Sequence, residues 1–216
     1  MPYPRVIENL IEQLMKLPGI GRRSAERIVF RLLNNDVEES KKLSDAIIEL
    51  KEKLRFCKLC NNFTELEVCP ICMDATRDPK IVCVVENPKD AIAIEKTGTF
   101  KGLYYVLLGV ISPSEGQGPD DLNIAKLIQK VRSENIHEVV LATDADMEGE
   151  LTALHLIKML RPLGVKVSRI GIGIPAGGSV EFADLSTLTM SFKSRRDVET
   201  ATVSPVHKLL PESSEI

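Results

Sequence analysis

The sequence has no apolar run that approaches the roughly 20 residues needed to cross a bilayer. Its first residues, Met1-Pro2-Tyr3-Pro4-Arg5, lack the apolar centre of a signal peptide. No internal repeat is visible along the chain. These absences predict a chain that does not span a membrane, and we expect it in the cytoplasm.

Neither sign of charge is in large excess, since the formal net charge is −3 over 216 residues. A content of 44% hydrophobic and 27% charged residues is typical of a globular protein, with room for one large domain or two to three small ones. The two signs are nevertheless segregated along the chain. Residues 81–150 carry twice as many acidic as basic side chains, whereas residues 16–31 have one acidic residue, Glu26, against Lys16, Arg22, Arg23, Arg27 and Arg31. This asymmetry indicates one face for a polyanion and another for a metal ion or a basic partner.

The basic segment lies in a predicted pair of helices. Residues 4–15 repeat apolar side chains at helical spacing, and Leu17-Pro18-Gly19-Ile20-Gly21 then forces a tight turn before a second helix, from Ser24 to Leu33. This is the pattern of a helix-hairpin-helix, whose turn presents backbone N–H groups that can hold a phosphate without reading the bases. Gly19 and Gly21 are therefore candidate DNA-binding residues.

Three arginines form a predicted stripe along the second helix of this hairpin. Arg23, Arg27 and Arg31 are spaced four residues apart, so their side chains share one face. Such a stripe contacts the phosphate backbone rather than the base sequence, and Arg23 and Arg27 are its main candidates for DNA binding. The alternative is a solvated charged face on a hairpin that serves packing alone.

Four of the five cysteines form two Cys-x-x-Cys pairs, Cys57 with Cys60 and Cys69 with Cys72. Each pair can form a turn that directs two thiolates at one ion, and two such turns complete a tetrahedral Zn²⁺ site. Two disulfides are disfavoured in a reducing cytosol, and a redox dithiol would need only one pair. We predict one structural Zn²⁺ per chain, and we expect the fifth cysteine, Cys83, in the core.

Two apolar runs end in carboxylates. Residues 81–85 lead to Glu86, and residues 139–141 lead to the segment Ala142-Thr143-Asp144-Ala145-Asp146-Met147-Glu148-Gly149-Glu150. Ligands bind at the carboxyl ends of strands in open α/β sheets, and Asp144 and Asp146 would point the same way if the strand extends through them. Close carboxylates repel unless a cation or a basic group lies between them, and oxygen ligands favour Mg²⁺. Gly149 is expected to let the backbone turn tightly into a helix that begins near Leu151.

The acidic pattern resembles a known domain. A strand that ends in Glu86, followed by a strand that ends in Asp-x-Asp-x-Glu-Gly, resembles the Toprim domain of topoisomerases, primases, small nucleases and recombination proteins. The order of motifs over about residues 4–197 resembles the RecR family of bacterial recombination mediators. This wider resemblance rests chiefly on Leu17-Pro18-Gly19-Ile20-Gly21, the four paired cysteines, Val84-Val85-Glu86, Glu148-Gly149, and Pro175 with Gly177-Gly178.

The resemblance implies a multi-domain α/β fold, in which alternating strands and helices form a doubly wound, mostly parallel sheet. The expected segments are a helical domain with the helix-hairpin-helix (residues 1–55), a four-cysteine zinc knuckle (56–79), a Toprim domain (80–173), a C-terminal arm (174–197) and a flexible tail (198–216).

The function implied by the resemblance is that of a DNA clamp without enzymatic activity. Members associate as dimers or ring-like tetramers, and they work with RecO and RecF to load recombinase onto gapped DNA in the RecF pathway of DNA repair. We accordingly expect sequence-independent binding to single-stranded, duplex and gapped DNA. The acidic residues Glu86, Asp144, Asp146, Glu148 and Glu150 are expected to dock a basic partner such as RecO, with Mg²⁺ as a further candidate ligand of the first three.

Two alternatives stay open. Many members have Asn-Pro-Thr where this chain has Asp144-Ala145-Asp146, so a small nuclease whose carboxylates hold Mg²⁺ is the enzymatic alternative. A zinc-stabilised scaffold that binds only proteins is the other. A topoisomerase is disfavoured because it needs a tyrosine nucleophile on a separate domain, and the three tyrosines here are the terminal Tyr3 and the predicted strand residues Tyr104 and Tyr105.

Overall fold

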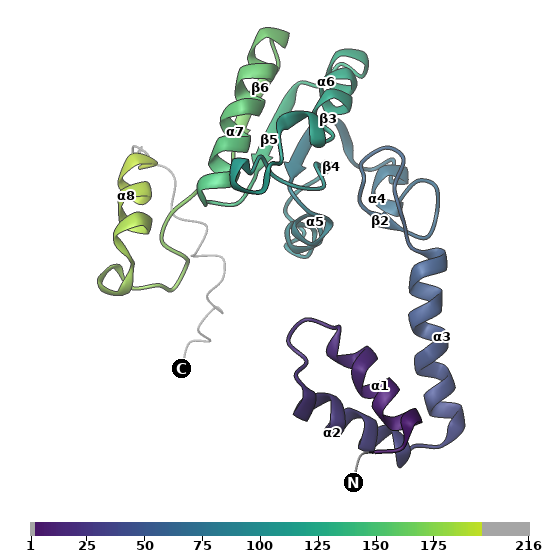
Figure 1. Ribbon diagram of the computed structural model, residues 1–216. Coiled ribbons are helices and arrows are strands. Elements are labelled where there is room, and N and C mark those ends of the chain that lie inside the picture. The colour runs from purple at the N-terminus through teal and green to yellow at the C-terminus, as the bar shows by residue number, and fades with distance from the viewer. Residues whose placement is uncertain (1–2, 196–216) are drawn as a thin grey trace, which may run out of the picture. The chain divides into compact units, whose positions relative to one another are not determined.

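The computed structural model describes residues 3–195 (Figure 1). The chain divides into two compact units, one that ends at Arg55 and one that begins at Phe56. The predicted tail, residues 198–216, and the last two residues of the predicted arm lie outside the described residues. No helix in the described part of the chain is long and apolar enough to cross a membrane.

The first unit consists of the helices α1 (Arg5–Met15), α2 (Arg22–Leu33) and α3 (Val37–Lys53). α1 and α2 pack around Ile11, Ala25 and Val29, which are 0–2% exposed. Gly19 has φ of +79°, a left-handed conformation that glycine adopts without steric cost, in the turn between the two helices. The predicted helix-hairpin-helix is therefore present, although its second helix begins two residues before Ser24.

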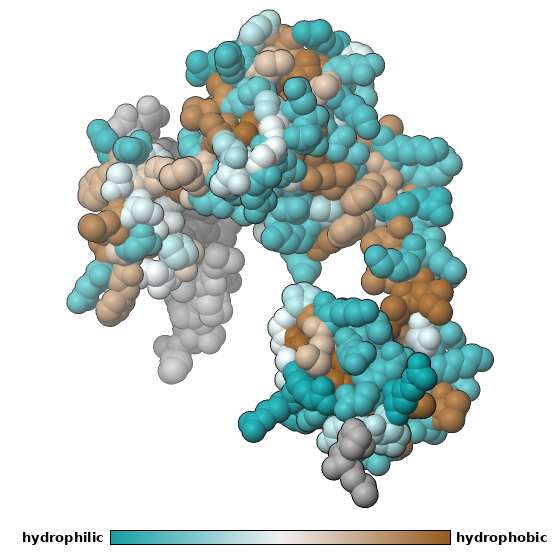
Figure 2. Space-filling model, viewed as in Figure 1, coloured by the Kyte–Doolittle hydropathy of each residue, from teal (hydrophilic) through white to brown (hydrophobic). Residues whose placement is uncertain are grey.

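The helix α3 contributes little to this core. It has no buried residue, and Leu43, Ile47 and Leu50 are each about half exposed. Figure 2 shows apolar surface over this helix. Leu43 and Ile47 line one side of an apolar groove of about 440 Å³, whose other side comes from α1 and α2.

A small zinc-knuckle segment begins at the boundary between the two units, which falls inside its first strand. Its two-stranded sheet pairs β1 (Arg55–Phe56) with β2 (Phe63–Thr64), and the short helix α4 (Pro70–Met73) follows. The N–H of Cys57 donates to the carbonyl oxygen of Asn62 at 2.7 Å, which closes the first cysteine turn. Asn61 in that turn has φ of +60°, a conformation that asparagine tolerates better than most residues.

Four parallel strands form the main sheet, in the order β4-β3-β5-β6. These are β3 (Asp78–Val85), β4 (Gly102–Val106), β5 (Glu138–Ala142) and β6 (Lys166–Arg169), with α5 (Pro88–Glu95), α6 (Ile124–Ser133) and α7 (Met147–Leu160) between them in sequence. The chain moves from β3 outward to β4 and from β5 outward to β6 in the opposite direction. The sheet is thus doubly wound as predicted, and its switch point lies between β3 and β5, where ligands bind in such folds.

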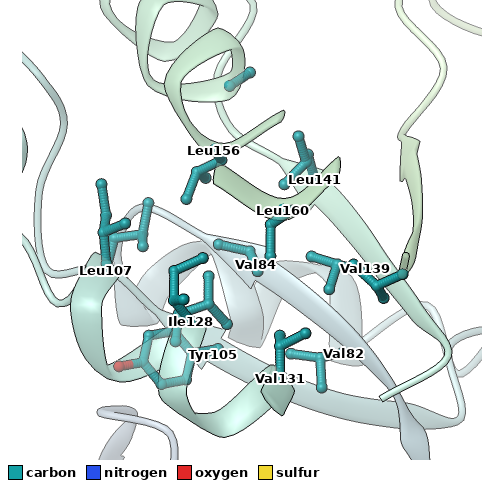
Figure 3. Close-up of a cluster of buried hydrophobic side chains, with 14 of the residues drawn as sticks. Val82, Val84, Tyr105, Leu107, Ile128, Val131, Val139, Leu141, Leu156 and Leu160 are labelled. Atoms are coloured by element: carbon teal, nitrogen blue, oxygen red, sulfur yellow. The ribbon is translucent and has the colours of Figure 1, made fainter. Parts of the chain in front are cut away.

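Successive residues of a strand point to opposite faces of the sheet, and each face has its own hydrophobic core. Val82 and Val84 of β3 pack with side chains of α6 and α7, such as Ile128 and Leu156 (Figure 3). Cys83 and Val85 belong to the other core, with Ala91 of α5. Burial on both faces explains why these strands are nearly continuous apolar runs in the sequence.

Irregular segments complete the second unit. Short 3-10 turns, η1 (Pro113–Glu115), η2 (Pro119–Asp121) and η3 (Arg161–Leu163), lie between the main elements. The C-terminal arm contains η4 (Val180–Phe182) and α8 (Leu185–Lys193), and Asp184 caps α8 by accepting from the N–H of Thr187 at 2.9 Å. α8 has no buried residue, and Phe182 and Leu185 are each 84% exposed.

Candidate nucleic-acid and metal sites

The four predicted zinc ligands converge. The Sγ atoms of Cys57, Cys60, Cys69 and Cys72 all lie within 4.8 Å of one another, and those of Cys60 and Cys69 are 3.6 Å apart. Tetrahedral Zn²⁺ with Zn–S distances of about 2.3 Å would place sulfur atoms about 3.8 Å apart. The cluster therefore has the donor type and spacing of a structural zinc site.

Hydrogen bonds among the sulfur atoms favour a thiolate at Cys69, whereas the hydrogen bond with Cys69 raises the pKa of the Cys60 thiol. Hydrogen bonds from the thiols of Cys60 and Cys72 lower the pKa of the Cys69 thiol. The N–H of Cys69 donates to Sγ of Cys57 at 3.2 Å, an interaction that also favours negative sulfur. Cys57, Cys60 and Cys69 are buried and Cys72 is partly exposed, and the burial of three of the four ligands suits a structural site.

The predicted basic stripe lies on the solvent face of α2. Arg23, Arg27 and Arg31 are all exposed, whereas Val29 on the opposite face is 2% exposed. Within residues 3–195, none of the three arginines has a carboxylate within salt-bridge distance. Arg27 and Arg31 also border a surface groove with Ser24 and the partly buried Ile28.

Arg22, the neighbour of this stripe, has a different role. Its guanidinium donates to both carboxylate oxygens of Glu8 at 3.0 Å and pairs with Glu26 at 3.2 Å. The Glu8 and Glu26 carboxylates raise the pKa of Arg22. Arg22 thus joins α1 to α2, and its charge is already compensated.

The N-terminus of α2 is open. Gly21 is the residue that precedes the helix, and it has no side chain to accept hydrogen bonds from the first turn. The first N–H groups of a helix have no partner inside the helix and carry a partial positive charge. An anion next to Gly21 would therefore meet both these N–H groups and the stripe.

Glu86 is the most unusual carboxylate of the acidic segment. It follows β3 at the switch point, is 4% exposed, and accepts a hydrogen bond from the N–H of Asp144 at 2.9 Å. Burial, together with the nearby charges of Asp144, Asp146 and Asp90, raises the pKa of Glu86 to about 7. The structure thus brings together the ends of two strands that lie 58 residues apart in sequence.

The condition under which Asp144 and Asp146 would point the same way, a strand that extends through both residues, is not met. β5 ends at Ala142, so neither residue belongs to the strand. The side chain of Asp146 instead caps α7, accepting from the N–H of Gly149 at 2.8 Å, while Asp144 is exposed. An N-terminal cap satisfies a helix N–H that would otherwise lack a partner, and this local requirement orients Asp146.

The expected role of Gly149 as a turn residue is also wrong. It lies inside the first turn of α7, which begins at Met147. A Cβ atom at this position would overlap the carbonyl oxygen of Asp144 and lie 2.8 Å from Oε1 of Glu86. The absence of a side chain is needed for this close approach, not for an unusual φ angle.

The remaining acidic residues have partners of their own. The hydroxyl of Ser112 donates to Glu148, which ties the loop after β4 to the start of α7. Glu150 forms an ion pair with Arg169 at the end of β6. In residues 3–195 the cysteines are the one group of three or more potential metal ligands whose donor atoms all lie within 4.8 Å, so the five carboxylates do not form such a group.

Two residues at this edge were missed in the sequence. Arg169 has two buried guanidinium nitrogens, Nε and Nη2, without a hydrogen-bond partner in the described residues, and it lies opposite Leu141 in the sheet register. Ser112 lies in a loop whose path sequence periodicity does not predict. The alternation of side chains along β6 could have placed Arg169 on the same face of the sheet as Val167. It could not have predicted the ion pair of Arg169 with Glu150.

Comparisons with known proteins cover nearly the whole described chain. Family models match at residues 7–51 (RecR, helix-hairpin-helix), 54–74 (RecR, zinc finger domain with four cysteines), 80–171 (Toprim domain) and 173–196 (RecR, C-terminal). The Recombination protein RecR of Acidothermus cellulolyticus is 48% identical over 197 residues, which cover 91% of this chain and 99% of that protein. That of Streptomyces coelicolor is 46% identical over 194 residues (90% and 98%), and that of Leifsonia xyli is 45% identical over 196 residues (91% and 99%).

The fold and the sites define a Toprim-domain protein with a helix-hairpin-helix and a four-cysteine zinc finger. The order of these parts and the near-complete coverage of the relatives are more specific than any one motif. The chain belongs to the RecR family.

Proposed function

We propose that this protein is a non-enzymatic mediator of DNA recombination and repair, which binds the DNA backbone through its hairpin unit. Relatives that match almost end to end are named Recombination protein RecR, which supports the recombination role. The observation that carries DNA binding is the exposed stripe of Arg23, Arg27 and Arg31, which lacks carboxylate partners in the described residues although Arg22 beside it has two. We expect the protein to act where chromosomal DNA is, in the bacterial cytoplasm.

The proposed contact is independent of base sequence. Phosphates can be held by the arginines along one face of α2 and by the open N-terminus of this helix at Gly21. Contacts to phosphates carry no information about base sequence. Each phosphate contact releases counterions, so the affinity should fall steeply with salt. Single-stranded, duplex and gapped DNA all present this backbone.

The test is a titration of labelled DNA at several salt concentrations with Arg23→Ala/Arg27→Ala. The double variant should bind more weakly. The slope of log affinity against log salt concentration should become less negative by roughly 1.8 on duplex DNA, which corresponds to the loss of about two phosphate contacts. Arg22→Ala/Lys16→Ala removes the same charge and serves as the control, with a smaller loss. If the double variant binds as the wild type does at low salt, the hairpin serves packing alone.

We further propose that the protein works as a homo-oligomer, a dimer or a ring-like tetramer. One hairpin offers few phosphate contacts, and several hairpins on one DNA gain effective concentration. The exposed apolar side chains of α3 and α8 support self-association, since neither helix contains a buried residue in the described part of the chain (Figure 2). The native mass at micromolar concentration decides this point, and a persistent monomer that retains DNA binding would contradict it.

The acidic residues around Glu86 are proposed to dock a basic partner protein of the RecO or RecF type. Asp144 is exposed and has no side-chain hydrogen bond among the described residues, so it is available for such a contact. Weak Mg²⁺ binding by Glu86, Asp144 and Asp146 is part of the proposal, because oxygen donors favour this ion, and it would require these carboxylates to move closer together than they are in the structure. Catalysis is not proposed, and Arg169, one cation at this edge, is already paired with Glu150.

A further inference from the structure

Two aromatic side chains lie together on the surface of the hairpin unit. The rings of Tyr3 and Phe30 have centroids 5.6 Å apart and an interplanar angle of 70°, an edge-to-face contact. Tyr3 is 37% exposed and Phe30 is 43% exposed. The core of this unit is formed by other residues, Ile11, Ala25 and Val29, so the aromatic pair is not needed to fill it.

The pair borders the basic stripe. Phe30 follows Arg27 by three residues on α2, a spacing at which side chains are neighbours, and it follows Arg23 by seven residues, two turns along the same face. Val29, by contrast, points into the core. An aromatic surface therefore adjoins arginines that have no carboxylate partner in the described part of the chain.

This combination suits an unpaired nucleotide better than a duplex. In a duplex the faces of the bases are covered by stacking, so a protein surface reaches only phosphates, sugars and groove edges. In a single strand the faces of the bases are free, and proteins bind them on aromatic side chains while basic residues follow the backbone. Tyr3 and Phe30 supply the aromatic surface, and Arg23 and Arg27 supply the positive charge.

A second copy of the chain is the competing occupant. A symmetric contact through the aromatic pair would bring the same patch of both copies together, and with it the uncompensated arginines of both. Like charges oppose that arrangement, whereas a polyanion is attracted by it. The charge of the patch therefore favours nucleic acid.

We infer that Tyr3 and Phe30 form a stacking site for an unpaired base, next to the phosphate contacts of Arg23 and Arg27, so that the hairpin unit binds single-stranded DNA more tightly than duplex of equal length. The inference rests on the proposed DNA binding and deepens it. In this proposal the aromatic pair determines the preference for single-stranded over duplex DNA, and the arginines determine the affinity for DNA of either kind.

The experiment compares three probes of equal length with the full-length protein: a mixed-sequence single strand, an abasic single strand that keeps every phosphate, and a duplex. Phe30→Leu keeps an apolar side chain but removes the flat ring. It should weaken binding to the normal single strand about tenfold and leave the abasic strand and the duplex nearly unchanged. Phe30→Tyr restores the ring and should bind as the wild type does.

Each other result overturns the inference in a recognisable way. If Phe30→Leu weakens all three probes equally, or none, the aromatic pair does not stack a base, while the arginine contacts stand. If Phe30→Leu lowers the native mass of the protein without DNA, the pair packs against a second copy. Failure of the proposed DNA binding is a separate result, in which Arg23→Ala/Arg27→Ala leaves every probe unaffected. Tyr3→Leu serves as the second variant, and circular dichroism confirms that each variant is folded.

Discussion

The N–H of Val106 donates to the carbonyl oxygen of Cys60 at 2.8 Å, which joins the zinc knuckle to the last residue of the edge strand β4. The side chain of Asn61 adds a second bond, from Nδ2 to the carbonyl oxygen of Val106 at 2.9 Å. A cysteine of the metal site and a strand of the Toprim sheet thus share hydrogen bonds. The state of the zinc site is therefore expected to affect the edge of the sheet.

Loss of zinc should destabilise structure beyond the knuckle. Cys69→Ser should lose the one Zn²⁺ per chain and raise the hydrogen-exchange rate of the Val106 amide, because apparent zinc-binding free energies of on the order of 10 kcal/mol hold such knuckles folded. Elemental analysis and hydrogen exchange measure the two effects. Cys83→Ala, a buried cysteine outside the cluster, is the control and should keep its zinc. A folded wild-type protein without zinc would contradict this prediction.

The stability of the protein should depend on pH through Glu86. Its pKa is about 7 in the folded protein against 4.5 for an unperturbed glutamate, so the folded state binds more protons between these values. The free energy of unfolding should then fall as pH rises through this window. Glu86→Gln cannot ionise and should be more stable than the wild type at pH 8 by up to about 3 kcal/mol, a gain that shrinks toward pH 5.

Denaturant unfolding at several pH values checks the Glu86 prediction. Glu115→Gln changes an exposed carboxyl and should unfold like the wild type at each pH. The same measurement tests Mg²⁺, which should stabilise the wild type at pH 8 and have less effect on Glu86→Gln if the carboxylates hold the ion. A wild-type stability that rises from pH 5 to pH 8 relative to Glu86→Gln would refute the assignment.

A methyl group at Gly149 should disrupt the acidic edge. Gly149→Ala would place Cβ against the carbonyl oxygen of Asp144 and near Glu86, and backbone atoms cannot move aside without a shift of the loop. We expect a loss of about 2 kcal/mol or more in the free energy of unfolding, typical of overpacking in a tight site. Gly171→Ala is the matched control, since a Cβ there meets nothing within 4 Å. Equal stability of the two variants would show that the segment from Asp144 to Gly149 adapts freely.

The protein should not cleave nucleic acid. Incubation with labelled single-stranded, duplex and gapped DNA and with structured RNA, in Mg²⁺ or Mn²⁺, should leave each substrate intact. Asp144→Asn should instead weaken binding of a basic partner protein, whereas Glu115→Gln should not. Cleavage by the wild type that disappears in Asp144→Asn would establish the nuclease alternative.

The sequence determined the features that depend on local spacing. Two Cys-x-x-Cys turns bring four thiolates to one point, because each turn is set by its own few residues. Gly19 in the tight turn and the four-residue spacing of Arg23 and Arg27 likewise follow from short-range geometry. The alternation of apolar runs and helical segments was enough to predict the parallel sheet, because strands buried on both faces must be apolar throughout.

Only the tertiary structure decided what each charged side chain meets. Arg22 and Arg23 are adjacent in sequence, yet Arg22 is paired because Glu8 lies within reach on the neighbouring helix. The pKa of Glu86 depends on burial and on Asp144, 58 residues away. Asp146 became a helix cap because β5 ends before it and α7 begins after it. These outcomes are set by contacts between segments that are distant in sequence. The spacing of residues within one segment does not predict how close two such segments lie in the folded chain.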